Sequence, residues 1–406
     1  MPELVALDLP AGPVFVDALR AAWDAGDAVL PLDPRLPAPA VAHLLDALRP
    51  TLVTGADGTR RRVDGIPAEE GDALVVATSG TTSTPKGVVL SHAAVRASAL
   101  ATSARLAVDP GRDRWVACLP LAHIGGLAVV TRALLTGTAC TVLERFDVDA
   151  VEREARAGAT LVSLVATALR RTDTSAFRAV LLGGAAPPGE LAPNVVTTYG
   201  MTETGSGLVY DGTPLDGVEV RIGASGVHSG SGHSGHSGTA DSGTADSGTS
   251  GTSGTSQEGT VGEVQVRGPM VFQHYRDGND PRLEGGWFPT GDAGRLSPDG
   301  TLEVFGRIAE VVVTGGEKVW PAAVEQVLSV HPGVAEVAVW KRADPEWGER
   351  VVAWVVPTPD VAPPSLSELR ELVSGQIAPW AGPRELMLVA SLPRTPSGKV
   401  RRSELA

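Results

Sequence analysis

The chain has 406 residues, a formal net charge of −13 at pH 7 and 43% hydrophobic residues. This length exceeds what one hydrophobic core usually supports, and it predicts two or three domains. The acidic balance excludes the usual basic class of nucleic-acid binders, so any phosphate site must rely on backbone N–H groups and a few cations. The sequence contains no run of 18 uncharged apolar residues, so we expect no transmembrane helix. The N-terminal stretch, with early acids and no basic segment, does not resemble a signal peptide.

Short apolar runs alternate with helical patterns over the first 220 residues. Residues 73–78 and 87–90 are typical of buried strands, and residues 91–107 predict a helix with Ser91 as its N-cap. Further strands are expected within residues 114–121, 137–144, 159–165 and 177–184. This alternation predicts an α/β domain. Cys118 and Cys140 lie in such apolar runs, so we expect small buried hydrophobic side chains with no disulfide.

Residues 223–259 consist mainly of Gly, Ser and Thr, with the repeat "SGTAD". Such a segment has little to bury, so it predicts a flexible insert between strands at 215–222 and 261–268 of one sheet. Its histidines, His228, His233 and His236, could suggest a metal site, but a mobile loop holds a metal poorly.

The pattern changes after residue 305. Helices are expected at 321–330, with Pro321 at the first helical position, and at 365–377. Alternating strands are expected at 334–342 and 349–357. The sequence therefore predicts a large N-terminal α/β domain with mixed sheets, residues 1–305, and a small α+β domain, residues 306–406.

The stretch "ATSGTTSTPKGVVLSH", residues 77–92, has the composition of a phosphate-binding loop. Gly80 and Gly87 permit close backbone approach, and Lys86 supplies positive charge. The hydroxyl donors are Thr78, Ser79, Thr81, Thr82, Ser83 and Thr84. A Walker A loop does not fit, because Pro85 stands where that motif has Gly and Gly87 where it has Ser or Thr. A strand-like run also follows the lysine, so residues 78–87 predict a phosphate loop of another kind.

Four further motifs follow this loop. They are "YGMTE" (199–203), "GWFPTGD" (286–292), "GRIAEVVVTGGEKVWP" (306–321) and "PRTPSGKVRR" (393–402). In this order the set resembles the adenylate-forming enzymes, which comprise acyl-CoA synthetases, luciferases and adenylation domains. The resemblance covers nearly the whole chain and implies that the C-terminal domain is mobile.

The resemblance implies that a carboxylate is joined to the α-phosphate of ATP with Mg²⁺ present. Charge builds up around phosphorus, so such a site needs cations and fixed donors more than acid–base groups. The implied ATP-binding residues are Thr78, Ser79, Gly80, Thr81, Thr82, Lys86, Gly183, Gly184, Ala185, Tyr199, Gly200, Met201, Thr202, Asp292 and Arg307. Within this set, Tyr199 would lie against the adenine, Asp292 would accept both ribose hydroxyls, and Thr202 would reach the α-phosphate. Glu203 would hold Mg²⁺.

The family's C-terminal motif supplies Lys399, which would bridge the carboxylate and the α-phosphate during adenylation. The implied catalytic residues are Lys399, Thr202, Glu203 and Lys86. The C-terminal domain would then rotate about a hinge near residues 307–310, so that Gly315 and Gly316 line the tunnel of the co-substrate CoA. At that hinge this chain has Ala309, where family members often have Asp or Lys.

The short length and "YDGTPLDGV" (210–218) are similar to a compact subgroup, the o-succinylbenzoate–CoA ligases of menaquinone biosynthesis in their actinobacterial form. Such a substrate needs an apolar pocket with donors for a second carboxylate. Candidate pocket residues are His123, Ser163, Thr167, Gly205 and Ser206. Which group meets the second carboxylate stays open.

Other readings stay open at this point. The chain could activate another aryl or fatty acid, or load a carrier protein as a stand-alone adenylation enzyme. A P-loop kinase or ATPase is disfavoured by the failed Walker pattern, and a non-catalytic binding protein by the presence of Lys399 and Glu203. We expect a cytoplasmic enzyme without membrane insertion; the sequence leaves the oligomeric state open, a homodimer being one option.

Overall fold

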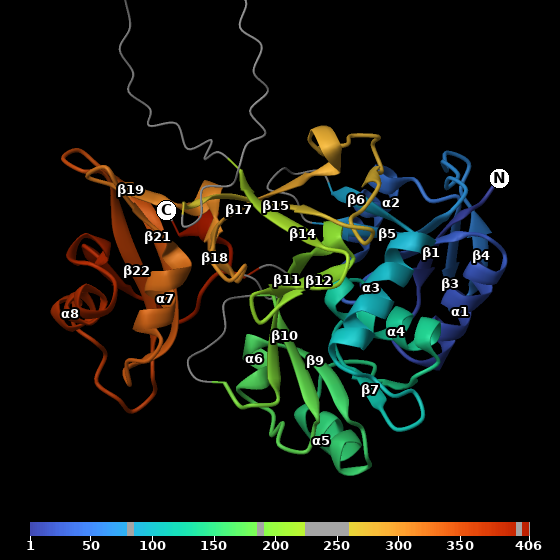
Figure 1. Ribbon diagram of the computed structural model, residues 1–406, viewed down its shortest axis with the longest axis horizontal. Coiled ribbons are helices and arrows are strands. Elements are labelled where there is room, and N and C mark those ends of the chain that lie inside the picture. Colours follow the sequence, from blue (N-terminus) through green and yellow to red (C-terminus); the bar gives the residue numbers. More distant parts are fainter. Residues whose placement is uncertain (79–84, 185–190, 224–259, 395–399, 406) are drawn as a thin grey trace, which may run out of the picture.

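The computed structural model describes residues 1–78, 85–184, 191–223, 260–394 and 400–405 (Figure 1). Four sheets and eight helices are present in this part of the chain. The prediction of an α/β fold with mixed sheets and a smaller C-terminal α+β part is confirmed. Among the described residues, no helix is both long enough and apolar enough to cross a bilayer.

The first seven-stranded sheet is parallel in its middle and antiparallel at both edges. Its strands, in spatial order, are β16 (His274–Tyr275), β6 (Lys86–Ser91), β5 (Asp72–Thr78), β2 (Ala28–Pro31), β1 (Leu4–Asp8), β3 (Leu52–Gly55) and β4 (Gly58–Arg61). Its central strands are almost fully buried, as expected for continuous runs of apolar residues covered on both faces. The edge strand β16 comes from a segment nearly 190 residues further along the chain than β6.

The second seven-stranded sheet has five parallel strands followed by a hairpin-like antiparallel edge. In spatial order its strands are β8 (Ala139–Val142), β7 (Arg114–Ala117), β9 (Leu161–Val165), β10 (Ala179–Gly183), β11 (Val195–Met201), β12 (Ser206–Tyr210) and β13 (Thr213–Pro214). All four strands expected between residues 114 and 184 are therefore confirmed. Cys118 and Cys140 are free thiols, and burial raises the pKa of each to about 12.

Helices α3 (His92–Arg105) and α4 (Ile124–Thr136) pack between these two sheets (Figure 1). Ser91 caps α3 as predicted, because its side chain accepts a hydrogen bond from the N–H of Ala94 at 3.1 Å. One large apolar cluster joins both sheets through these helices. The remaining helices of this region are α1 (Pro13–Asp24), α2 (Ala38–Leu48), α5 (Val148–Arg156), α6 (Ala166–Leu169) and the 3-10 turn η1 (Thr202–Thr204).

The third sheet is antiparallel and flanks the predicted insert. It runs β14 (Glu219–Gly223), β15 (Gly262–Arg267), β17 (Phe288–Leu296) and β18 (Leu302–Arg307), with the turn η2 (Glu284–Gly286) before β17. Glu219 pairs with Arg267 and Gly223 with Glu263, so the two flanks of the insert are adjacent strands, as predicted. His228, His233 and His236 lie outside the described residues.

The C-terminal residues form a separate five-stranded sheet with its own core, beside β17 and β18 (Figure 1). Its strands are β19 (Val312–Thr314), β20 (Glu317–Val319), β21 (Val334–Asp344), β22 (Gly348–Pro357) and β23 (Glu385–Leu388). Helices α7 (Pro321–Leu328) and α8 (Leu366–Gln376) cover it, with turns η3 (Ile308–Glu310), η4 (Pro379–Ala381) and η5 (Arg402–Glu404). Pro321 opens α7 as predicted.

Candidate active site

The two ends of the hydroxyl-rich turn are direct neighbours across an antiparallel ladder. Thr78 ends β5, Lys86 begins β6, and the two residues are paired in register. The Thr78 hydroxyl donates to the carbonyl oxygen of Lys86 at 3.4 Å. The predicted phosphate-binding residues Ser79, Gly80, Thr81 and Thr82 lie outside the described residues. A strand follows Lys86, as predicted, whereas a Walker A loop leads into a helix.

The carboxyl ends of parallel strands β9, β10 and β11 meet at one edge of the second sheet, where α/β proteins bind ligands. Gly183 ends β10, and Gly184 follows with a φ of +88° that favours glycine. Ala185 lies outside the described residues. Gly200 allows a close approach of β12, because a Cβ there would lie 2.1 Å from the carbonyl oxygen of Ser206. The backbone geometry at this edge therefore favours glycine at two of the predicted positions, Gly184 and Gly200.

Met201 ends β11, and Thr202 and Glu203 open the turn η1. The hydroxyl of Tyr275, from the edge strand β16, donates to Glu203 Oε1 at 2.9 Å. Lys86 Nζ lies 5.0 Å from the centre of the Tyr275 ring. Burial and the nearby Glu203 charge raise the pKa of Tyr275, so its hydroxyl stays protonated and donates. The structure therefore brings the predicted residues Lys86 and Glu203 together around one tyrosine.

Asp292 is a buried carboxylate in β17 that faces residues from two other strands. The hydroxyl of Tyr199 donates to its Oδ2 at 2.8 Å, and Arg307 Nε lies 3.1 Å from its Oδ1. Arg307 also donates to the carbonyl oxygen of Thr290 at 2.8 Å and is paired in register with Asp292. Burial and the Asp292 charge raise the pKa of Tyr199. Three residues predicted for the nucleotide thus form one contact group.

Tyr275 was missed by sequence reasoning, although a signal was available. The chain has only three tyrosines. The hydroxyls of Tyr199 and Tyr275 each bond a carboxylate predicted for the site, while Tyr210 bonds Thr102 in the core at 3.0 Å. The rarity of tyrosine could have drawn attention to residue 275, but its partners could not be read from local sequence.

His123 stands at the start of α4, and its Nε2 lies 3.9 Å from Asp33 Oδ2. Asp33 is 5% exposed and is held by Arg35, whose Nε and Nη2 donate to its two oxygens at 2.8 and 2.6 Å. The Arg35 hydrogen bonds hold the pKa of Asp33 below its usual value. This acidic neighbour of the predicted pocket histidine was also missed, since 90 residues separate the two in sequence.

The other predicted pocket residues occupy different environments. Ser163 is half-buried in β9, and Thr167 is exposed in α6. Gly205 has a φ of +66° after η1. The Ser206 hydroxyl is buried against Ser98 of α3 at 3.0 Å, so only the backbone at this position is available to face a ligand.

The glycines predicted for the CoA tunnel form the tight turn between β19 and β20. Gly315 and Gly316 have φ values of +59° and +86°. The N–H of Gly315 donates to the carbonyl oxygen of Trp347 at 2.9 Å, and a Cβ at Gly315 would lie 2.6 Å from the Trp347 ring. At the predicted hinge, Glu310 of η3 pairs with Arg402 at 3.2 Å. Lys399 lies outside the described residues.

The donor set around Glu203 fits Mg²⁺. In the described ranges, no three His, Cys, Asp or Glu side chains gather into a ready-made metal site. Mg²⁺ commonly binds through one or two carboxylates while substrate phosphates and water supply the other ligands. A single carboxylate near the phosphate-loop lysine satisfies that requirement.

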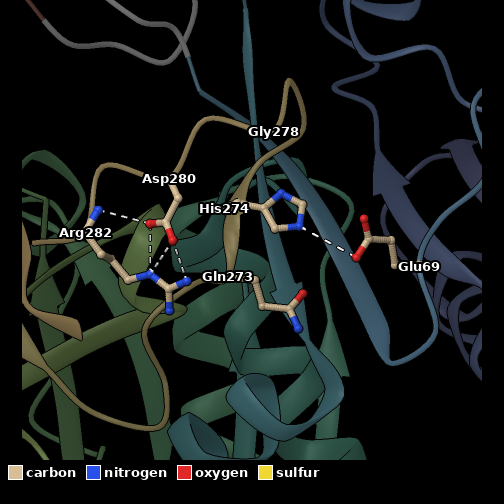
Figure 2. A pocket seen from close by; sticks show the side chains of 6 residues that line it. All are labelled: Glu69, Gln273, His274, Gly278, Asp280 and Arg282. Carbon is tan, nitrogen blue, oxygen red and sulfur yellow. Dashed lines mark hydrogen bonds and ion pairs between the residues drawn. The ribbon is translucent and has the colours of Figure 1, made fainter. Parts of the chain in front are cut away.

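A surface cavity of about 500 Å³ lies next to β16 but contains none of the predicted residues. It is lined by Glu69, Gln273, His274, Gly278, Asp280 and Arg282. Figure 2 shows His274 facing Glu69 and Asp280 paired with Arg282. Because side chains alternate along a strand, His274 in this cavity and Tyr275 beside Glu203 lie on opposite faces of β16. The cavity is therefore distinct from the candidate active site.

Comparison with known families gives the class of the protein. Residues 60–276 match the family of AMP-binding enzymes, and residues 323–399 match the AMP-binding enzyme C-terminal domain. The chain belongs to the family of AMP-binding enzymes.

Individual relatives and solved structures within this family are similar to the chain over most of its length. A probable 2-succinylbenzoate–CoA ligase of Mycobacterium tuberculosis is 37% identical over 359 residues, which cover 82% of this chain and 83% of the relative. The o-succinylbenzoate CoA synthetase (MenE) of Bacillus subtilis, solved with the acyl-adenylate intermediate OSB-AMP, superimposes with a TM-score of 0.82 at 26% identity. That match covers 99% of this chain and 88% of the other. The same synthetase, solved with ATP and magnesium ion, has a TM-score of 0.80 at 26% identity, and its match covers 99% of this chain and 89% of the other.

Proposed function

We propose that this chain is an AMP-forming ligase that joins o-succinylbenzoate to CoA. The observation that carries the proposal is the similarity, over 99% of the chain, to a synthetase that holds OSB-AMP. The relative named 2-succinylbenzoate–CoA ligase supports the same substrate. The product is o-succinylbenzoyl-CoA, which places the enzyme in menaquinone biosynthesis, and the use of ATP and CoA is consistent with a cytoplasmic location.

The reaction has two steps. First, a carboxylate oxygen of the acid attacks the α-phosphorus of ATP, and pyrophosphate leaves to give the acyl-adenylate. Next, the CoA sulfur attacks the acyl carbon, the thiol proton is released, and AMP leaves. Both attacks build negative charge on oxygen, so fixed donors and cations lower the barrier.

The nucleotide would be held by two groups of residues. Lys86, with the hydroxyls of the turn that precedes it, would bind the β- and γ-phosphates, and Thr202 would donate to the α-phosphate. Asp292, oriented by Tyr199 and Arg307 at the distances given above, would accept hydrogen bonds from the ribose. Mg²⁺, when bound at Glu203, would neutralise phosphate charge.

The C-terminal domain, residues 306–406, would serve both steps. Lys399 would neutralise the attacking carboxylate during adenylation. Rotation about residues 307–310 would then remove it and bring Gly315 and Gly316 to the CoA tunnel. The tight turn at these glycines, with both φ values positive, supports a role in which backbone approaches a ligand closely.

The aryl acid would lie beside His123, Ser163, Thr167 and the backbone at Gly205 and Ser206. His123 has an acidic neighbour, Asp33, whose Oδ2 lies 3.9 Å from the imidazole Nε2. The imidazole would donate a hydrogen bond to one of the substrate's two carboxylates.

Pyrophosphate release over a panel of acids, with and without CoA, tests the proposed function. The panel contains o-succinylbenzoate, benzoate, malonate and octanoate. We expect o-succinylbenzoate to have the highest kcat/KM, and CoA to be consumed in equal amount with it. A higher value for another acid would reassign the substrate, and release without CoA consumption when a carrier protein is acylated would reassign the acceptor.

A further inference from the structure

Residues 272–276 form a short segment that is fixed by main-chain hydrogen bonds on both sides. The N–H of Phe272 donates to the carbonyl oxygen of Glu203 at 2.8 Å. The N–H of Gln273 donates to Val89, and that of Arg276 donates to Gly87 at 2.7 Å. The segment therefore connects the turn that carries Glu203 to the strand that begins with Lys86.

Tyr275 is the residue of this segment that reaches both groups with its side chain. It is 9% exposed and packs against Phe272, with ring centres 4.9 Å apart. Its hydroxyl donates to Glu203 Oε1 at 2.9 Å, and Lys86 Nζ lies 5.0 Å from the ring centre. The hydrogen bond from the Tyr275 hydroxyl to one carboxylate oxygen restricts the rotation of the Glu203 carboxylate. The face of the Tyr275 ring attracts the ammonium group of Lys86.

We propose that Tyr275 is a positioning residue that orients Glu203 toward Mg²⁺ and holds Lys86 at the phosphates. This inference rests on the proposed function, because it assigns ATP and Mg²⁺ to these two side chains. The hydroxyl and the ring act separately: the first serves the metal carboxylate and the second serves the lysine. Tyr275 contacts both Lys86 and Glu203, which are 117 positions apart in the sequence. It therefore couples the position of the phosphate-binding lysine to that of the metal-binding carboxylate.

A purely structural role would give a different pattern. Phe272, which is buried next to Tyr275, and Phe288, which packs against Phe272, supply the packing. If packing were the whole role, Tyr275→Phe would keep it and leave Mg²⁺ dependence unchanged. The positioning role instead predicts that Tyr275→Phe weakens only Mg²⁺ binding, whereas Tyr275→Leu weakens both Mg²⁺ binding and nucleotide binding.

The experiment measures binding of the ATP analogue AMP-PNP by calorimetry, across a MgCl₂ titration and in EDTA, without any acid, so that its α–β bond stays intact. For Tyr275→Phe we expect about 10-fold weaker apparent Mg²⁺ affinity and unchanged nucleotide affinity in EDTA. For Tyr275→Leu we expect, in addition, about 2- to 5-fold weaker AMP-PNP binding in EDTA, because Lys86 loses the ring. Steady-state adenylation across the same titration should show the same shift in Mg²⁺ requirement.

Tyr210→Phe is the matched control, because Tyr210 is equally a buried tyrosine with a bonded hydroxyl, but its partner is Thr102 in the core. We expect it to match the wild type in AMP-PNP binding at every Mg²⁺ concentration. An unchanged Mg²⁺ dependence in Tyr275→Phe overturns this inference and leaves the proposed function intact. Absence of Mg²⁺-dependent AMP-PNP binding by the wild type overturns both.

Discussion

Two buried aspartates in this molecule are each paired with an arginine, but their surroundings differ. Asp113 lies 2.7 Å from Arg178, and Asp292 lies 3.1 Å from Arg307. Both aspartates are 6% exposed, and the arginine side chains are 42% and 49% exposed. Burial and pairing alone therefore do not distinguish a structural carboxylate from one that serves a ligand.

The neighbours make the distinction. Asp113 also accepts hydrogen bonds from the Thr160 hydroxyl at 2.7 Å and from the N–H of Asp109 at 2.9 Å. These partners join the amino ends of β7 and β9, at the edge of the sheet opposite to the candidate site. Asp292 instead accepts a hydrogen bond from Tyr199, and its partner Arg307 is the last residue of β18 and the first residue of the predicted hinge. We therefore assign Asp113 to the support of the fold and propose that Asp292 binds the nucleotide.

Asp292→Asn should have the largest effect of the changes that test this comparison. An amide offers one acceptor oxygen and no charge, so hydrogen bonds to the ribose are weakened or lost. We expect kcat/KM for ATP to fall about 10- to 100-fold, with little change in the urea midpoint. A lower urea midpoint with unchanged kcat/KM would mean that Asp292, like Asp113, only supports the fold.

Asp113→Asn should give the reverse result. The substitution leaves the donors of Arg178 and Thr160 poorly satisfied in a buried position, and we expect the free energy of unfolding to fall by about 1–3 kcal/mol. Activity measured well below the new melting temperature should match the wild type. A specific loss in kcat/KM for ATP, without loss of stability, would contradict the assignment of Asp113 to the support of the fold.

Tyr199→Phe should have a smaller effect than Asp292→Asn. The ring stays, but the hydroxyl that donates to Asp292 Oδ2 is lost. We expect KM for ATP to rise about 2- to 10-fold, while kcat changes less. Steady-state kinetics with ATP varied at saturating acid and CoA tests this; equal KM values in variant and wild type would leave Arg307 as the residue that orients Asp292.

The smallest predicted effect is on the pH dependence of stability. Burial alone would raise the pKa of Asp113, but the hydrogen bonds from Arg178, the N–H of Asp109 and Thr160 together outweigh burial and hold the pKa below its usual value. Because the folded pKa is the lower one, this group stabilises the fold above the unfolded pKa of about 3.9 and loses that contribution as pH falls through the folded value. Urea unfolding of wild type and Asp113→Asn between pH 7 and pH 3 should therefore converge at the acid end. A constant difference across this range would contradict the lowered pKa.

The local parts of the fold and site follow from the sequence. Ser91 and Pro321 mark helix starts because capping and the missing proline N–H are local effects. The apolar run after Lys86 predicts the strand that the structure has there. Because a Walker A loop leads into a helix, this strand distinguishes the loop from a Walker A motif.

The contacts that complete the site do not follow from the sequence. Tyr275 reaches Glu203 because β16 adds to the edge of the first sheet, and no local pattern specifies which edge a two-residue strand joins. The approach of Asp33 to His123 likewise depends on packing between segments 90 residues apart. A motif can therefore supply the identity of the reacting groups but not the residues that orient them.

Rapid-quench mass spectrometry of the intermediate tests the central claim most directly. The wild-type chain is mixed with ATP, Mg²⁺ and o-succinylbenzoate without CoA, quenched, and analysed before and after addition of CoA. We expect o-succinylbenzoyl-AMP to accumulate in an amount close to that of the enzyme, and CoA to convert it to the thioester with release of AMP. Formation of ADP, or of the thioester without any adenylate, would contradict the central claim.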